Sequence, residues 1–153
     1  MSHLGCGCPG SLARVIERNE NKEVDTQREK ATSELRQWPV QLHLVPPTAP
    51  YFRNADILIS ADCVAFALGS MHQDLIKGRA LAIACPKLDD TDSYVQKLAT
   101  IFSENEIKSI TVAIMEVPCC RGLDVIVRQA LGLSGKEIPL EIVVIGVDGE
   151  RRR

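Results

Sequence analysis

Residues 109–123 combine the pattern of a buried strand with two thiols at the point where that strand would end. The segment begins with an apolar run rich in β-branched residues, which is typical of strands covered on both faces of a sheet. Pro118 has no amide hydrogen and would interrupt the ladder. Cys119 and Cys120 follow, and Gly122 leads into a helical pattern. The segment therefore predicts a strand, a thiol-bearing turn and a helix, which constrains the chain to an α/β fold.

The same alternation of strand and helix patterns runs through residues 35–153. Strands are predicted at 40–45, 56–61, 79–84, 107–117 and 140–147. Helical patterns occupy 68–77, ended by Gly78, then 89–105 and 123–133, with a turn or short helix at 49–54. Such alternation favours one domain with a mostly parallel, doubly wound sheet of about five strands, as in Rossmann or flavodoxin-like folds.

Residues 1–34 have a different composition and are expected to form a Cys-x-Cys arm followed by a polar linker. Cys6 and Cys8 lie among glycines and a proline, and residues 18–34 are almost entirely polar or charged. A segment of this kind buries too little apolar surface to offset the entropy of ordering it. We therefore expect two units, the arm at 1–34 and the α/β domain at 35–153.

The overall composition is that of a globular protein without an obvious polyanionic or lipid partner. The net charge of −2 gives no reason to expect binding to nucleic acid or to a membrane surface. No apolar run approaches the roughly 20 residues of a membrane span, and residues 1–10 lack the features of a signal peptide. The basic residues 151–153 are expected to be a solvated tail. These features favour a cytoplasmic protein.

Six cysteines are many for a cytoplasmic chain of 153 residues. Thiols stay reduced in that compartment, so a disulfide framework is disfavoured. A single buried cysteine is often a small core residue, but that explanation does not suit all six. Metal binding or redox chemistry explains them better.

Three predicted strands end in cysteine, at Cys63, Cys85 and Cys119. Ligands of open α/β sheets bind outside the carboxyl ends of the strands, so these thiols are expected at one edge. Iron–sulfur clusters are held by several thiolates, usually four for a 4Fe-4S cluster. We therefore predict a 4Fe-4S site with Cys120 as the favoured fourth ligand; burial or a redox partnership with a neighbouring thiol is the alternative role for Cys120. Secondary candidates for that position are Cys6 and Cys8.

The familiar short motifs of cofactor sites do not occur in this chain in their usual structural context. It contains no Cys-x-x-Cys, which disfavours a ferredoxin run, a zinc ribbon and a thioredoxin motif. Residues 5–10 match Gly-x-Gly-x-x-Gly but follow no predicted strand, so a nucleotide site would depend on fold analogy alone. Among polar residues, Asp62 could orient a ligand, and Lys87 could offset thiolate charge. Asp89 and Asp90 are typical of a helix start.

The cysteine-centred segments also resemble those of a family of anaerobe iron–sulfur proteins, the 4Fe-4S dicluster ferredoxin-domain proteins. The matching segments are Gln37-Trp-Pro-Val-Gln-Leu42, Ala61-Asp-Cys63, Cys85-Pro-Lys-Leu-Asp-Asp90, Ser109-Ile-Thr-Val112, Met115-Glu-Val-Pro-Cys-Cys120 and Gly5-Cys-Gly-Cys-Pro-Gly-Ser11. The resemblance is to the C-terminal α/β region of that family and implies an iron–sulfur domain. Family members usually carry an N-terminal ferredoxin module, which these 153 residues do not contain. The implied redox partner is therefore a separate ferredoxin-like protein.

Three functions remain open on this reading. The leading one is an iron–sulfur protein that takes part in electron transfer or redox chemistry with a ferredoxin-like partner. The second is a metal- or thiol-dependent redox enzyme that uses the strand-end cysteines. The third is a module in which a bound metal is structural.

Overall fold

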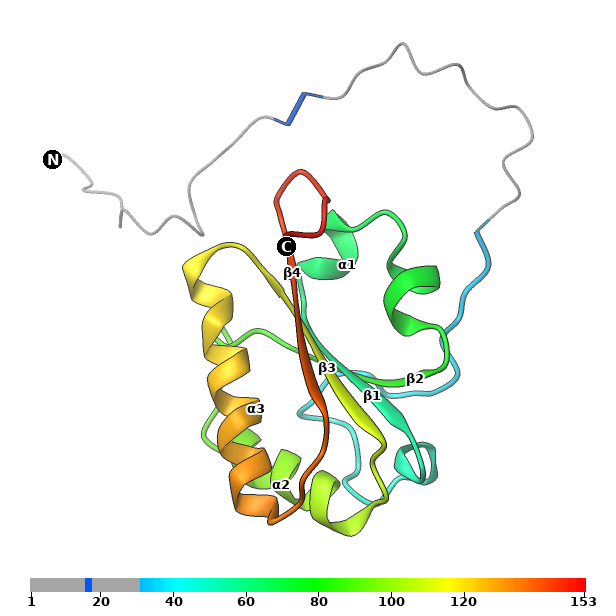
Figure 1. Ribbon diagram of the computed structural model, residues 1–153, viewed down its shortest axis with the longest axis vertical. Helices are drawn as coiled ribbons and strands as arrows, with labels where there is room; N and C mark the ends of the chain where they lie inside the picture. The colour runs from blue at the N-terminus through cyan, green and yellow to red at the C-terminus, as the bar shows by residue number, and fades with distance from the viewer. Residues whose placement is uncertain (1–15, 18–30) are drawn as a thin grey trace, which may run out of the picture.

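The fold is built on a single parallel sheet. The computed structural model describes residues 16–17 and 31–153, so most of the predicted arm at 1–34, including Cys6 and Cys8, lies outside the described residues. The strands are β1 (Asp56–Ala61), β2 (Arg79–Ala84), β3 (Ser109–Met115) and β4 (Leu140–Ile145). They pair in the order β2-β1-β3-β4, all in parallel (Figure 1). The predicted single α/β domain with a parallel sheet is confirmed.

The central strand β1 shows why these apolar runs form a sheet. Ile57, Leu58 and Ile59 are adjacent in sequence, point alternately to opposite faces, and are each at most 1% exposed. Ile59 lies opposite Ala82 of β2 and Val112 of β3. A strand that is apolar on both faces must be covered on both faces, and helices provide that cover.

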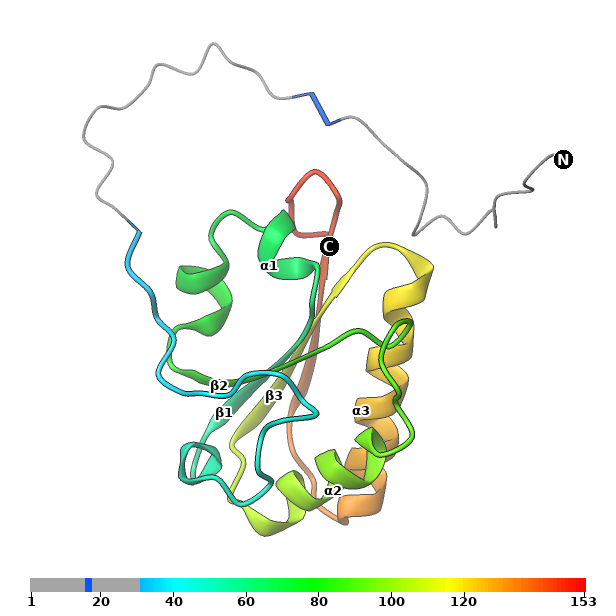
Figure 2. The ribbon, with the colours of Figure 1, turned by 180° about the vertical axis from the view of Figure 1, so that it is seen from behind.

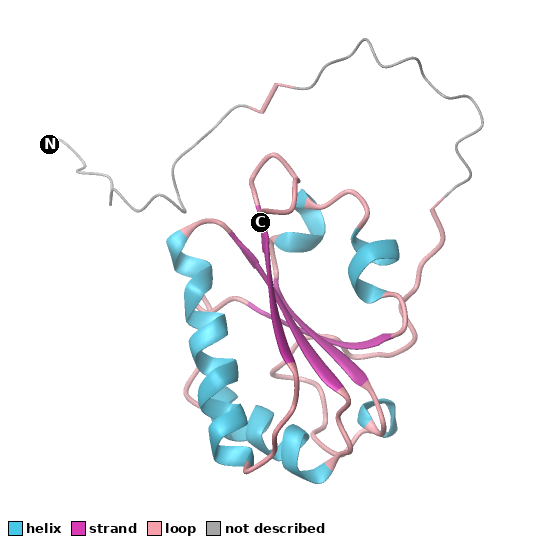
Figure 3. Cartoon of the chain, viewed as in Figure 1, coloured by secondary structure: helices cyan, strands magenta, loops and turns pink. Residues whose placement is uncertain are grey.

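Helices lie on the two faces of the sheet. The helical segments are η2 (Pro50–Phe52), α1 (Val64–Ala67), the π-helical turn η3 (His72–Ile76), α2 (Tyr94–Glu104), η4 (Pro118–Cys120) and α3 (Arg121–Ser134). The longer helices α2 and α3 pack against each other on one face, whereas α1 and η3 lie on the other (Figures 1 and 2; helices are cyan and strands magenta in Figure 3). This arrangement is the doubly wound one that the sequence predicts.

The prediction of a strand at 40–45 is wrong. Gln41 forms one isolated parallel bridge with Ile83 at the β2 edge. The amides three and four residues further on then donate to the Gln41 carbonyl oxygen, at 2.8 and 3.0 Å, which turns the chain away from the sheet. Pro39 and Pro46 flank the segment, and neither has an amide hydrogen to extend a ladder. The described residues therefore form four strands rather than about five.

Two predicted helices have different limits in the structure. The helix predicted at 68–77 is reduced to η3, because the backbone of Leu68, directly after α1, is extended and η3 begins only at His72. Gly78 follows with a φ of 75°, a conformation that suits glycine, as predicted. The helix predicted at 89–105 begins only with Tyr94. The residues before Tyr94 form a loop instead.

The core lies between the sheet and its helices, and it is continuous. Its largest fully buried side chains include Tyr94, Phe52 and Phe102, all 0% exposed. Leu98 and Ile101 share the buried face of α2 with Phe102, as the helical spacing predicts. Burial of one such side chain contributes about 1.5–3 kcal/mol. No helix in residues 16–17 and 31–153 has the length and apolarity needed to cross a membrane.

The strand order creates a crevice at the carboxyl edge of the sheet. From β1 the chain crosses to β2 on one side, and from β3 it crosses to β4 on the other side. The loops that leave the neighbouring strands β1 and β3 therefore diverge. Because the strands are parallel, the loop after β2 reaches the same edge (Figure 1). This is the edge at which the predicted cysteines lie.

The C-terminal arginines are not simply solvated. After β4 the chain makes a tight turn, and Arg151 forms an antiparallel bridge with Ile145. Arg151 also pairs with Glu141 at 2.5 Å, and Arg152 pairs with Glu116 at 3.0 Å. The tail remains exposed, but the side chains of Arg151 and Arg152 contact residues of β4 and the end of β3.

Candidate functional site

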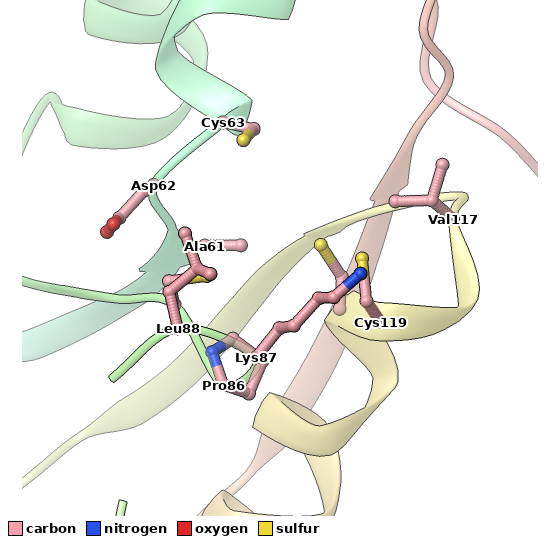
Figure 4. Close-up of a pocket in the computed structure, with 10 residues that line it drawn as sticks. Ala61, Asp62, Cys63, Pro86, Lys87, Leu88, Val117 and Cys119 are labelled. Carbon is pink, nitrogen blue, oxygen red and sulfur yellow. The ribbon is translucent and has the colours of Figure 1, made fainter. Parts of the chain in front are cut away.

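Four thiols from three strand ends line one pocket of about 270 Å³. Cys63 follows β1, Cys85 follows β2 directly, and Cys119 and Cys120 lie in the turn after β3. Figure 4 shows Cys63 and Cys119 on opposite sides of the pocket. The structure thus brings together the four cysteines on which the sequence-based site is built, whereas the secondary candidates Cys6 and Cys8 fall outside the described residues.

The turn after β3 explains how two adjacent cysteines can both face the pocket. Inside a strand, neighbouring side chains point to opposite faces. Here the strand has ended at Met115, and Pro118 begins the single 3-10 turn η4, which runs directly into α3. Both Cys119 and Cys120 line the pocket as a result.

The thiols differ in exposure and in acidity. Cys63 is exposed, Cys85 and Cys119 are half-buried, and Cys120 is only 7% exposed. Burial raises the pKa of Cys120 to about 11, against the opposing effect of a backbone hydrogen bond with Met115. Burial also raises the pKa of Cys63, and Cys85, Asp62 and Cys119 add to that effect. Without a bound metal, Cys63 and Cys120 are therefore protonated at neutral pH.

A carboxylate fastens the loop that carries Cys85. Asp89 accepts a hydrogen bond from the Cys85 amide at 3.0 Å, and the Asp89 amide donates to the Cys85 carbonyl at 2.9 Å. The same carboxylate oxygen accepts from Gln41 at 3.3 Å and from the hydroxyl of Tyr94. Burial raises the pKa of Asp89, but the bonds from Tyr94, Cys85 and Gln41 outweigh it, and the pKa is lowered overall. Asp89 therefore stays ionised and holds the turn closed.

This role of Asp89 corrects the sequence analysis, in which Asp89 and Asp90 mark a helix start. The helix begins later, at Tyr94, because Asp89 is engaged with the cysteine loop. The available signal was the four-residue spacing from Cys85 to Asp89 across a proline. In loops, aspartate often bonds nearby backbone amides, so that spacing was open to this interpretation.

Asp62 is the acidic side chain of the pocket wall. Its amide donates to the Ala84 carbonyl at 3.1 Å, which ties the end of β1 to the end of β2. Its Oδ1 atom is buried and has no hydrogen-bond partner among the described residues. Burial, with a smaller contribution from Asp89, raises the pKa of Asp62. Oδ1 of Asp62 is therefore a buried acceptor that no described residue satisfies.

The remaining walls are mostly apolar and close-packed. Ala61, Pro86, Leu88 and Val117 line the pocket, and Leu88 is 83% exposed at its rim. Gly122, in the first turn of α3, permits the helix to approach the cysteine loop, because a β-carbon there would lie 3.2 Å from Cβ of Pro86.

One basic side chain enters this apolar pocket. Lys87 extends across it, and its amine end points toward Cys119 (Figure 4). The N-terminus of α3 lies beside Cys119 and Cys120, since Cys120 is the N-cap residue of this helix. Both features place positive charge near the sulfur atoms.

In the described part of the chain, no three His, Cys, Asp or Glu side chains converge tightly enough to hold a single metal ion. The four thiols instead surround a space between them.

Comparisons with other proteins identify the family of the domain. A protein of Archaeoglobus fulgidus, described as an uncharacterized protein, is 35% identical over 116 residues, which are 76% of this chain and 81% of the relative. No solved structure matches the chain at a significant level. A model of the Rossmann-like domain family matches residues 49–152, a range that includes all four strands and the four pocket thiols. The chain therefore belongs to the Rossmann-like domain family.

Proposed function

We propose that the protein binds a 4Fe-4S cluster through Cys63, Cys85, Cys119 and Cys120 and serves in electron transfer or redox chemistry. The observation that carries this proposal is the convergence of four thiols from three strand ends on one pocket. Four thiolates are the usual ligand set of such a cluster. When bound, the cluster supplies one-electron transfer.

The dimensions and lining of the pocket support a small, soft group. Its volume of about 270 Å³ lies just below the range of about 300–1,000 Å³ that is usual for organic ligands. Its walls are mostly apolar, which suits a cluster that must be shielded from water. A cluster also separates its thiolate ligands by its own width, which is consistent with thiols that surround a space instead of meeting at one point.

The charges around the pocket favour a thiolate-bound group. A cluster with four thiolate ligands is anionic, so nearby positive charge stabilises it. Lys87 extends toward Cys119, and the N-terminus of α3 lies at Cys120. Metal binding must also deprotonate the thiols, whose protons leave as the ligands bind. For Cys120, with a pKa of about 11, this coupling makes cluster insertion easier as the pH rises.

The segments around the four thiols also resemble the α/β region of the 4Fe-4S dicluster ferredoxin-domain proteins. By that resemblance, the electron donor or acceptor is a ferredoxin-like protein. A site built from reduced thiols fits the cytoplasm, which the sequence favours. Neither a nucleic acid nor a membrane is required by this function.

The test is anaerobic reconstitution with iron and sulfide, followed by metal and sulfide analysis and electron paramagnetic resonance of the reduced protein. We expect one 4Fe-4S cluster per chain. Replacement of Cys63, Cys85 or Cys119 by serine should abolish or strongly reduce incorporation, because oxygen is a harder ligand. The matched control is a variant with serine at Cys6 and Cys8, which should retain the cluster. Full incorporation in the triple variant of Cys63, Cys85 and Cys119 would refute the proposal.

A second candidate is thiol redox chemistry, and the position of two thiols favours it. Cys119 and Cys120 are adjacent in the turn η4 and line the same pocket. By thiol–disulfide exchange, the disulfide of another molecule could accept two electrons and two protons from this pair, so that it is reduced to two thiols while Cys119 and Cys120 become a disulfide. Protein that takes up no iron but loses two thiols on treatment with a small disulfide would favour this function. Stoichiometric zinc without sulfide would instead indicate a structural metal.

A further inference from the structure

The cysteine turn after β3 is fastened to the C-terminal segment by a carboxylate. Glu116 is the first residue after β3, three residues before Cys119. Its amide donates to the Ile145 carbonyl at 2.9 Å, which continues the pairing of β3 with β4. Its carboxylate accepts a hydrogen bond from the Val147 amide at 3.1 Å. Glu116 thus joins the base of the cysteine turn to the chain beyond β4.

Arg152 holds the same carboxylate from the other side. Its Nε donates to Glu116 at 3.0 Å, and its second guanidinium nitrogen donates to Asp148 at 3.1 Å. Its own amide donates to the Val144 carbonyl at 2.8 Å, so the backbone is fixed as well. Hydrogen bonds from Arg152 and then Val147 lower the pKa of Glu116, which keeps the acceptor ionised.

Gly146 makes space for this arginine. A β-carbon at residue 146 would lie 2.1 Å from a guanidinium nitrogen of Arg152, so a side chain there would displace it. The turn that returns the chain is closed by the Gly146 amide, which donates to the Glu150 carbonyl at 2.9 Å. Arg152 is thus held in one position by three features. These are the space at Gly146, the turn after β4, and the carboxylates of Glu116 and Asp148.

We infer that Arg152 is a positioning residue that acts through Glu116 to hold the Cys119–Cys120 turn at the pocket. This inference rests on the proposed function in so far as the turn presents cluster ligands. The arrangement parallels the other side of the pocket, where Asp89 fastens the loop of Cys85. Each cysteine loop that leaves β2 or β3 is therefore fixed by a carboxylate.

The experiment compares Arg152→Ala with Arg153→Ala, which removes the same charge one residue further on. In metal-free protein, the alkylation rate of the peptide that carries Cys119 and Cys120 is followed by mass spectrometry. Release of an exposed ion pair changes a local equilibrium only a few-fold, so we expect an increase of about threefold in Arg152→Ala. In Arg153→Ala the rate should equal that of the wild type.

The variant Glu116→Gln tests whether Arg152 acts on the cysteine turn through Glu116. If Arg152 acts through Glu116, the double variant with Arg152→Ala should alkylate no faster than the faster single variant. After reconstitution, the midpoint potential should shift in Arg152→Ala and not in Arg153→Ala. The midpoint potential depends on the surroundings of the cluster. If the contact between Arg152 and Glu116 only stabilised the fold, its loss would leave those surroundings and the potential unchanged.

Four outcomes test the inference and the proposed function. Equal thiol rates in wild type, Arg152→Ala and Arg153→Ala would overturn the inference, and so would additive effects in the double variant. A wild type without iron would refute the proposed cluster, but the metal-free thiol rates would still decide the role of Arg152. A wild type that binds the cluster, together with unchanged rates and potential in Arg152→Ala, would refute only the inference.

Discussion

The amide of Cys85 donates a hydrogen bond to the carboxylate of Asp89, four residues later, at 3.0 Å. That bond, with those from Gln41 and Tyr94 to the same oxygen, converts a loop at the end of β2 into a fixed turn. A thiol on a fixed turn has less conformational entropy to lose when it binds a metal. The position of Cys85 is therefore preorganised by residues that do not themselves line the pocket.

Replacement of Asp89 by asparagine should destabilise the metal-free protein by about 1–3 kcal/mol, the usual cost of disrupting charge-assisted hydrogen bonds in a partly buried place. Asp90 provides the matched control, because it is exposed and, among the described residues, accepts a hydrogen bond only from the nearby amide of Asp92. Asp90→Asn should change stability by less than about 0.5 kcal/mol. Urea unfolding followed by circular dichroism measures both. Equal losses in the two variants would contradict the role given to Asp89.

The two tyrosines should respond oppositely to loss of the hydroxyl. Tyr94 donates to Asp89, so Tyr94→Phe should cost about 1–2 kcal/mol of unfolding free energy. The hydroxyl of Tyr51 is buried without a hydrogen-bond partner in the described structure, so Tyr51→Phe should be neutral or stabilising. Thermal and urea unfolding of the pair provide the comparison. A clear loss of stability in Tyr51→Phe would contradict the absence of a hydrogen-bond partner for this hydroxyl among the described residues.

The pH dependence of stability should reflect the raised pKa of Tyr94. Burial, followed by the hydrogen bond to Asp89, raises the pKa of Tyr94 above its ordinary value of 10.0. The folded protein therefore holds this proton more tightly than the unfolded chain does. The contribution of protonated Tyr94 to the free energy of unfolding is complete below about pH 10 and is lost as the pH rises further. The stability of wild type should fall more steeply above pH 10 than that of Tyr94→Phe; parallel pH profiles would argue against this linkage.

Two glycines in α3 form a matched pair for helix stability. At Gly132 a β-carbon would meet nothing within 4 Å, so Gly132→Ala should stabilise the protein by about 0.5–1 kcal/mol. At Gly122 the β-carbon would lie 3.2 Å from Pro86, and the gain in helix propensity should be reduced or reversed. Gly122→Ala should also lower cluster incorporation, because it displaces the loop of Cys85. An equal gain in stability at both sites would show that the contact with Pro86 is easily relieved.

The thiol of Cys120 should be the slowest of the four pocket thiols to react in the metal-free protein. With a pKa of about 11 in place of 9.0, it has roughly a hundredfold less thiolate at pH 8. Its alkylation by iodoacetamide should accelerate about tenfold per pH unit between pH 8 and 10. The same peptide in urea-unfolded protein is the reference, and there the reaction should be faster. Equal rates in native and unfolded protein at pH 8 would contradict the raised pKa.

The sheet could be predicted from the sequence because its strands carry a local signal. The runs at 56–61 and 79–84 are apolar on both faces, and the structure has strands with those limits. Their parallel pairing then accounts for the common position of Cys63 and Cys85, since parallel strands deliver their carboxyl ends to one edge. The segment 40–45 has a similar apolar pattern but contacts the sheet through one bridge. Its hydrophobicity reflects contact with the core, which a strand pattern does not distinguish.

The fixing of the cysteine loops could not be predicted in the same way. An aspartate before a helix is usually a cap, and only the folded loop shows that Asp89 bonds to Cys85 instead. The contact of Arg152 with Glu116 joins residues 36 positions apart and depends on the turn after β4. Local sequence carries no information about such a pairing, because tertiary structure alone brings the two groups together.

The divergence of the loops after β1 and β3 has a consequence for assembly. Cys63, Cys85 and the pair at 119–120 come from three separate crossover units, so a fragment that contains only one of them presents at most the two thiols of one turn. The complete ligand set exists only after β1, β2 and β3 have paired, and iron incorporation would thus report on completed folding. Conversely, a group bound to all four thiols would link the three units covalently and oppose their separation. The bound group would then stabilise the folded domain in addition to serving as its redox centre.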